Sequence, residues 1–131
     1  MTDLASNHAE PPEVFMVLDA VDVELVAAFW VEALGFRRVD RLDQYVVLAP
    51  VEGHPGSILL VQGVPESKTV KNRMHVDLHV TDPDAEAERL VALGATRTGD
   101  GNLGEIMWIT MVDPEGNEFD IGRRSDVTSR R

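Results

Sequence analysis

The chain has 131 residues, no cysteine, and 23 acidic against 12 basic residues, which gives a formal net charge of −11. This length predicts a single domain with a substantial core, and the lack of cysteine excludes disulfides, thiolate metal sites and thiol catalysis. The negative charge repels phosphate backbones and no apolar run is long enough to cross a membrane, so we expect a cytoplasmic protein with no nucleic-acid or membrane partner.

The first half of the chain predicts one helix among four strands. Residues 1–13 are polar, contain Pro11-Pro12, and are expected to form a flexible arm. Asp22 is a favourable N-cap for a helix whose apolar residues recur every three or four positions, and Gly35 is a favourable stop. Short apolar stretches predict the strands, over 14–20, 36–39, 44–49 and 57–62.

After a polar connection over 63–72, the second half repeats this order. Its first strand, 73–82, alternates strictly between apolar and titratable side chains, as expected for a half-buried strand. Asp82 caps a helix that stops at Gly94, and Asp-Pro-Glu-Gly-Asn at 113–117 has the composition of a turn. The apolar face of the alternating strand holds Met74, Val76, Leu78 and Val80, and the other face holds His75, Asp77 and His79. The other predicted strands cover 96–98, 106–112 and 118–122.

The two halves are related by an offset of about 60 residues, which indicates an internal repeat. Asp22 and Ala33-Leu34-Gly35 in the first half correspond to Asp82 and Ala92-Leu93-Gly94 in the second. We therefore predict an α+β fold of two βαβββ modules that form one curved mixed sheet around a cleft, with the helices outside. The expected ranges are 14–122 for the domain, 14–63 and 73–122 for the modules, and 123–131 for a C-terminal tail.

The chain resembles the vicinal oxygen chelate superfamily, which includes glyoxalase I, the bleomycin-resistance proteins and the extradiol dioxygenases. Three segments carry the resemblance, and the last two are specific and similar to the small glyoxalase-like branch. They are the helix from Asp22 through Phe29-Trp30 to Gly35, the strand Asn72-Arg73-Met74-His75-Val76-Asp77-Leu78, and the segment Asp113-Pro114-Glu115-Gly116-Asn117-Glu118-Phe119-Asp120. The resemblance implies binding of a small molecule in the cleft and a homodimer.

The resemblance also implies four positions for metal ligands, on the inner faces of four strands. Phe15 occupies the first, and this apolar ring in place of the usual histidine argues against glyoxalase I activity. The other three positions are Gln62, His75 and Asp120, whose nitrogen and oxygen donors suit Mn, Fe, Ni, Co or Zn.

Further polar groups share these strand faces because side chains alternate along a strand. Asp77 lies on the face of His75 and Glu118 on that of Asp120, so these two carboxylates are the predicted proton-transfer residues. The remaining predicted pocket residues are Phe15, Asp19, His79 and Trp108.

Two functions are consistent with these residues and with the resemblance. One is an isomerase, lyase or dioxygenase in which a divalent metal polarises vicinal oxygens of a small organic substrate. The other is a metal-free protein that binds a drug or metabolite without turnover, through pocket shape and aromatic stacking. His75 with Asp120 favours the first function, and Phe15 favours the second.

Overall fold

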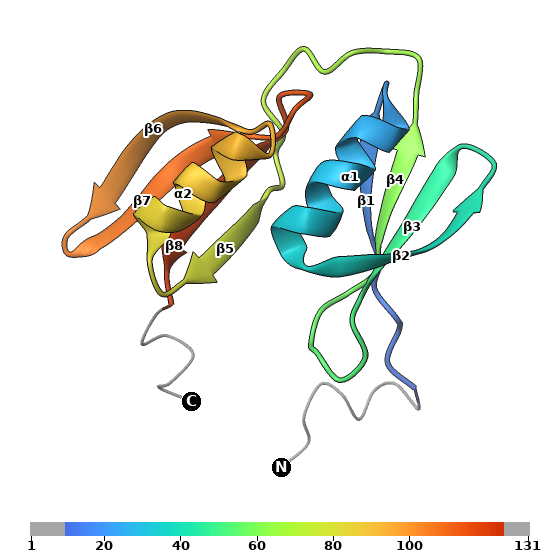
Figure 1. Ribbon diagram of the computed structural model, residues 1–131, viewed down its shortest axis with the longest axis horizontal. Helices are drawn as coiled ribbons and strands as arrows, with labels where there is room; N and C mark the ends of the chain where they lie inside the picture. Colours follow the sequence, from blue (N-terminus) through green and yellow to red (C-terminus); the bar gives the residue numbers. More distant parts are fainter. Residues whose placement is uncertain (1–9, 125–131) are drawn as a thin grey trace.

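The computed structural model describes residues 10–124, which form two helices and eight strands (Figure 1). The predicted arm at 1–13 and tail at 123–131 therefore lie largely outside the described residues. The elements are β1 (Met16–Ala20), α1 (Val23–Leu34), β2 (Phe36–Leu42), β3 (Tyr45–Pro50), β4 (Leu59–Gly63), β5 (Val76–Val80), α2 (Pro83–Ala92), β6 (Thr96–Leu103), β7 (Ile106–Val112) and β8 (Glu118–Arg123). This order confirms the α+β class and the two βαβββ modules.

Both helices begin and end with local signals that the sequence carries. The Asp22 carboxylate accepts a hydrogen bond from Leu25 N at 3.1 Å, and the Asp82 carboxylate accepts one from Ala85 N at 3.2 Å. These bonds satisfy backbone donors of the first helical turn that have no partner within the helix. Gly35 ends α1 with φ of 66°, a left-handed conformation that costs glycine little.

The two modules share one topology. In the first the strand order is β1-β4-β3-β2, which we call sheet A, and in the second it is β5-β8-β7-β6, which we call sheet B. In each sheet the first strand pairs in parallel with the last one, and the other pairs are antiparallel. Each sheet also has a register shift in its outermost strand, between Arg38 and Asp40 in β2 and between Arg97 and Gly99 in β6.

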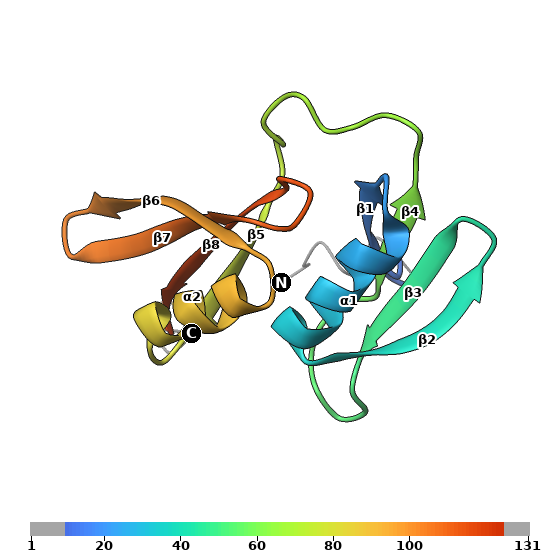
Figure 2. The ribbon, with the colours of Figure 1, turned by 45° about the horizontal axis from the view of Figure 1, so that its top comes forward.

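The eight strands form two separate four-stranded sheets rather than the single curved sheet expected from the sequence. The described hydrogen-bond ladders pair β1 only with β4 and β5 only with β8. Instead of being joined along an edge, the modules meet through α1, which lies between the two sheets in both ribbon views (Figures 1 and 2). Its aromatic side chains Phe29 and Trp30 contact Phe119 of β8, with ring centroids 6.0 and 5.2 Å apart.

One hydrophobic core therefore serves both modules. It combines the buried faces of α1 and α2 with the helix-covered faces of sheets A and B. Its largest fully buried side chains come from both modules, and they are Phe119, Leu48, Leu90, Met111 and Ile121. Among residues 10–124, no helix covers the opposite faces of the two sheets (Figure 2), and we call these the open faces. Each helix covers one face of its own sheet, and the aromatic side chains of α1 also contact the second module.

The turn at 113–117 joins the modules by hydrogen bonds. The Asp113 carboxylate is 2% exposed and accepts bonds from Trp30 Nε1 at 2.9 Å, from Asn117 N at 2.9 Å and from Asn117 Nδ2 at 3.0 Å. The Glu115 carboxylate accepts bonds from the backbone of Val21 and Asp22 at the start of α1. This turn is structural, as its composition predicts, and it also holds α1 against the second module.

Several details of the prediction are wrong, and β2, predicted over 36–39, continues to Leu42. Met74 was expected in the core but is 86% exposed, because β5 begins only at Val76 and Met74 precedes it. His75 likewise lies just before the strand. β6 continues to Leu103 instead of ending at Thr98, since its pairing with β7 holds glycine, aspartate and asparagine residues that have low strand propensity.

No helix among residues 10–124 has the length and apolar character needed to cross a bilayer.

Candidate functional site

The open face of sheet B carries most of the predicted site residues. Along β5, Val76, Leu78 and Val80 pack against the core, whereas Asp77 and His79 are exposed on the other side. Register places Asp77 beside Asp120 of β8 and Asp120 beside Thr110 of β7. The strand pairing therefore brings two carboxylates from opposite ends of the module into adjacent positions.

His75, Asp77 and Asp120 form a compact group of three potential metal ligands, which we call the triad. One ligand atom from each residue lies within 4.8 Å of the other two. His75 Nδ1 is 3.1 Å from Asp77 Oδ1, with the side chains 33% and 47% exposed. Of the predicted metal ligands, His75 and Asp120 are thus brought together, and the predicted proton-transfer residue Asp77 joins them.

The electrostatic environment of Asp120 favours the binding of a cation. Burial raises the pKa of the Asp120 carboxyl, and the nearby charge of Asp77 raises it further, while His75 and Lys71 act in the opposite direction. Two carboxylates this close repel each other, and a positive charge between them would relieve that repulsion. The triad is therefore a site at which a cation would be stabilised.

The carboxylate of Glu118, the other predicted proton-transfer residue, accepts hydrogen bonds on both of its oxygens. Burial works to raise its pKa, but Lys68 Nζ at 2.9 Å and the backbone N–H of Asn72 at 3.0 Å lower the pKa of Glu118 to about 2. A carboxylate with such a low pKa is a weak base at neutral pH. Its contacts instead fix the end of the connection between the modules beside the triad.

We expect Glu118→Gln to destabilise the protein at neutral pH and to have little effect in strong acid. The folded-state pKa of Glu118 is lowered, so the stability that its ionised form contributes is present above the ordinary value of 4.5 and is lost as pH falls toward about 2. Urea unfolding of wild type and variant at several pH values measures this. Glu105→Gln, an exposed residue in the β6–β7 turn, is the control. A difference that persists unchanged at pH 2 would contradict the assignment.

Two predicted pocket residues, His79 and Trp108, lie on the same open face. His79 pairs with Gly122, and Gly122 pairs with Trp108. These positions lie two residues along β5 and β8 from the Asp77–Asp120 pair. Both side chains therefore adjoin the triad on one surface.

The other predicted residues lie in the first module. Asp19 of β1 pairs with Gln62 of β4, and Gln62 pairs with Tyr45, on the open face of sheet A. Phe15 precedes β1 and is 42% exposed. The three residues of the triad all belong to the second module, whereas Gln62, the remaining predicted metal ligand, belongs to the first.

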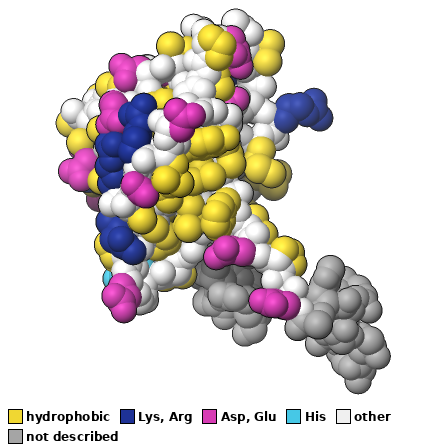
Figure 3. Space-filling model, turned by 90° about the vertical axis from the view of Figure 1, so that its right-hand side faces the viewer, with side chains coloured by type: hydrophobic (Ala, Val, Ile, Leu, Met, Phe, Trp, Pro, Cys, Tyr) yellow, Lys and Arg dark blue, Asp and Glu magenta, His cyan; other side chains and the backbone are white. Residues whose placement is uncertain are grey.

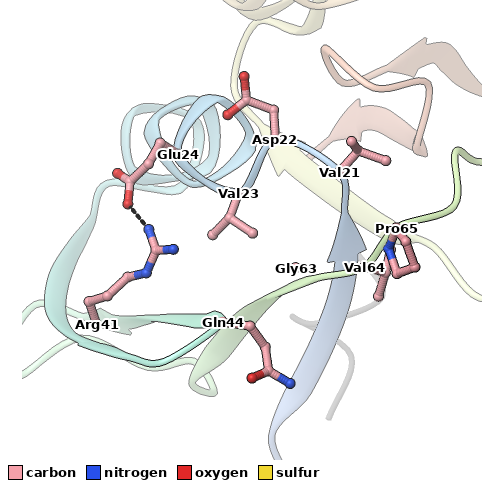
Figure 4. Close-up of a pocket in the computed structure, with 9 residues that line it drawn as sticks. All are labelled: Val21, Asp22, Val23, Glu24, Arg41, Gln44, Gly63, Val64 and Pro65. Atoms are coloured by element: carbon pink, nitrogen blue, oxygen red, sulfur yellow. Dashed lines mark hydrogen bonds and ion pairs between the residues drawn. The ribbon is translucent and has the colours of Figure 1, made fainter.

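A separate open hollow of about 620 Å³ lies where α1 begins and β4 ends (Figure 4). Its charged groups already have partners, since Glu24 forms ion pairs with both Arg38 and Arg41 and Asp22 accepts a hydrogen bond from Leu25 N. Just before the helix, the backbone N–H groups of Val21 and Asp22 already donate hydrogen bonds to the Glu115 carboxylate. The hollow thus offers no free charged group comparable with the triad.

Sequence reasoning missed four residues that support the open face of sheet B. Lys68 and Asn72 hold Glu118, and the Trp108 and His79 rings closely approach Gly101 and Gly122. A glycine inside a strand often marks a close approach by another group, and this signal was available in the sequence. The contacts of Lys68 and Asn72 span 50 and 46 residues and had no local signal.

Comparison with known families shows a match over residues 15–122 to the family model described as a glyoxalase-like domain. A comparison with the curated proteins finds no match. Among solved structures, the chain is similar to a glyoxalase/bleomycin resistance protein/dioxygenase family enzyme from Burkholderia phytofirmans PsJN. The identity is 17% and the TM-score 0.70, over 85% of this chain and 97% of that one.

Two further structures share the fold at low identity. A bleomycin-binding protein from Streptomyces verticillus, solved with copper(II)-bleomycin, is 22% identical with a TM-score of 0.60, over 88% of this chain and 98% of that one. A lactoylglutathione lyase from Agrobacterium tumefaciens is 21% identical with a TM-score of 0.62, over 86% and 95%. With the two βαβββ modules and the family match over 15–122, the chain belongs to the glyoxalase-like domain family of the vicinal oxygen chelate superfamily.

Proposed function

We propose that the protein holds a small organic molecule on the open face of sheet B and acts on it with the help of a divalent metal bound by the triad. The observation that supports this most strongly is the convergence of His75, Asp77 and Asp120 within 4.8 Å. The reaction classes that we propose are those of an isomerase, a lyase or a dioxygenase.

The donor set fits a divalent transition metal. One imidazole nitrogen and two carboxylate oxygens suit Mn, Fe, Co, Ni or Zn, and three protein ligands leave positions open for substrate, as in catalytic sites. Both His75 and Asp77 are also partly exposed, so an ion can enter from solvent. A bound ion would supply a Lewis acid that polarises the substrate oxygens.

The residues of the triad would have different roles. The close contact of His75 Nδ1 with Asp77 Oδ1 fixes the imidazole ring and leaves Nε2 available as a ligand. Asp120 would be the anionic ligand. Asp77, whose Oδ1 lies beside the imidazole, would supply the second carboxylate ligand, and Glu118 would position the neighbouring chain through Lys68 and Asn72.

We expect tag-free protein to contain close to one equivalent of metal by elemental analysis, and His75→Ala and Asp120→Ala to lower metal affinity at least about tenfold. Metal at a hundred times its dissociation constant should stabilise wild type by about 2.7 kcal/mol. Because the pKa of Asp120 is raised, protons should compete with the metal for this carboxylate at a higher pH than they would for an ordinary aspartate. The stabilisation by metal should therefore begin to decline at that higher pH.

His54→Ala, in the exposed turn before β4, is the matched control and should retain full metal binding. If wild type contains no metal and none of the five ions raises its melting temperature, the metal-assisted function is wrong.

A metal-free binding protein is the second candidate. The apolar Phe15 at the first predicted ligand position favours it, as does the structural likeness to a protein solved with copper(II)-bleomycin. In that case the acidic triad would hold a cationic or hydrogen-bonding group of the ligand directly, and no product would form.

We further propose a homodimer in which the open face of sheet A from one chain covers the ligand site of the other. Figure 3 shows apolar side chains gathered on one side of the molecule, where sheet A lies. On this sheet Val17 and Leu42 are 54% and 55% exposed, which is unusual for a strand face in a monomer. Such pairing would bring Gln62, Asp19 and Phe15 of the partner to the triad.

We expect light scattering after gel filtration to show a dimer for wild type and a monomer for Val17→Asp, because a charge would be buried without a partner. Val70→Asp replaces a valine that is 75% exposed in the connection between the modules, and it should remain a dimer. Wild-type protein that is monomeric at tens of micromolar would contradict the proposal.

A further inference from the structure

His75 differs from the other two residues of the triad because it lies outside the strands. Asp77 belongs to β5 and Asp120 to β8, whereas His75 comes just before Val76, the first residue of β5. Strand pairing therefore fixes the two carboxylates, but the position of the imidazole depends on the chain that precedes β5. That chain is the connection over 64–75, which contains no helix or strand.

Two hydrogen bonds anchor this connection at Asn72, three residues before His75. The backbone N–H of Asn72 donates to the Glu118 carboxylate at 3.0 Å, and its side-chain Nδ2 donates to Asn117 Oδ1 at 3.1 Å. The chain from Asn72 to His75 can span at most about 11 Å. Because Val76 is already paired with β8, His75 is held from both sides and has little freedom to move away from the triad.

The side chain of Asn117 links this anchor to the hydrogen bonds between the modules. Asn117 is 6% exposed, and its Nδ2 donates to Asp113 Oδ2 at 3.0 Å. Since an ionised carboxylate can only accept, the amide nitrogen of Asn117 must face Asp113, which leaves its oxygen to face Asn72. Asp113 also accepts from Trp30 Nε1 at 2.9 Å. A continuous row of hydrogen bonds therefore runs from α1 of the first module to the chain beside His75.

We propose that Asn72 and Asn117 are positioning residues for the metal site and that they act through His75. The turn at 113–117 then has a second role besides joining the modules, because the hydrogen bonds that hold α1 also hold the chain that carries one ligand. The inference rests on the proposed function for the metal itself. The placement of His75 can, however, be measured on the metal-free protein.

A double-mutant cycle with Zn²⁺ as the only ligand tests this role. Asn72→Ala should weaken zinc binding, measured by calorimetry, about tenfold, which is the lower end of the loss that outer partners of a metal site produce. In the His75→Ala background the same substitution should have no effect, because the residue through which it acts is absent. An equal loss of affinity in both backgrounds would contradict the proposal, since a general disturbance of the structure would produce it.

Two further variants serve as the rescue and the control. Asn72→Ser keeps a hydroxyl donor and should recover part of the zinc affinity that Asn72→Ala loses. Thr69→Ala alters an exposed residue of the same connection and should bind zinc as tightly as wild type. All of these variants should fold, because both positions lie outside the helices and strands, and circular dichroism checks this.

A second measurement separates this inference from the metal hypothesis. The heteronuclear ¹H–¹⁵N NOE of the His75 amide reports backbone motion on the picosecond-to-nanosecond timescale without any metal. If wild type binds no zinc, a high NOE that falls in Asn72→Ala still supports the anchor, whereas an NOE that is low in wild type or unchanged in the variant overturns it. If wild type binds zinc and Asn72→Ala binds it equally tightly, the positioning role is wrong.

Discussion

Asp113→Ala should lower the free energy of unfolding by at least about 3 kcal/mol, because several buried donors lose one shared acceptor. The Asp113 carboxylate accepts from Trp30 Nε1, from the backbone of Glu115 and Asn117, and from Asn117 Nδ2. Alanine would leave these groups without partners at a position that is 2% exposed. For a chain of this size the melting temperature should fall by about 10 °C.

Two further variants test the cause of this loss. Asp113→Asn should recover only part of the stability, since its amide nitrogen would face donors rather than accept from them. Asp84→Ala, whose side chain is 83% exposed, should change stability by less than about 1 kcal/mol. A loss for Asp113→Ala no larger than that of Asp84→Ala would disprove the role of the turn in joining the modules.

Phe119→Ala should cost about 3–5 kcal/mol, the range for a buried phenylalanine that leaves a cavity. Phe119 is 0% exposed and contacts both Phe29 and Trp30 of the other module. The cavity would therefore open between the modules as well as within sheet B. We expect the amide protons of α1 to exchange faster in this variant, although the substitution lies in β8.

Leu48→Ala is the matched comparison, because Leu48 is equally buried but belongs to β3 of the first module. It should cost about 2–5 kcal/mol and should accelerate exchange mainly in the first module. If the two variants produced the same exchange pattern across both modules, Phe119 would have no special part in coupling them. Phe119→Leu, which retains most of the volume, should be milder than Phe119→Ala.

The secondary structure was largely predictable because its signals are local. Asp22, Asp82 and Gly35 sit at helix ends with the hydrogen bonds or the backbone conformation that their residue types favour. The alternation from Val76 to Val80 likewise placed Asp77 and His79 on the open side of β5. Asp77 was grouped with His75 by this alternation, whereas Asp120 was grouped with His75 by the family resemblance and not by any local pattern in the sequence.

The arrangement of the modules was not predictable, since it depends on contacts between distant residues. Nothing near Trp30 in the sequence indicates that its indole bonds to Asp113, 83 residues away. Similarly, the acidic character of Glu118 suggested a proton carrier, and only the approach of Lys68 reveals an ionised anchor. In both cases the sequence gives the type of residue, but it carries no local signal for the distant residue that it contacts.

The register shifts in β2 and β6 matter for the shape of the two outer hairpins. Each places one extra residue, Val39 or Thr98, in the outermost strand, between positions that pair regularly on either side. An inserted residue bends a strand and increases its local right-handed twist. It also interrupts the row of free backbone groups that an edge strand offers to other chains. Both sheets therefore carry, at equivalent places, a built-in obstacle to growth by addition of strands from neighbouring molecules, which helps to protect them from edge-to-edge aggregation.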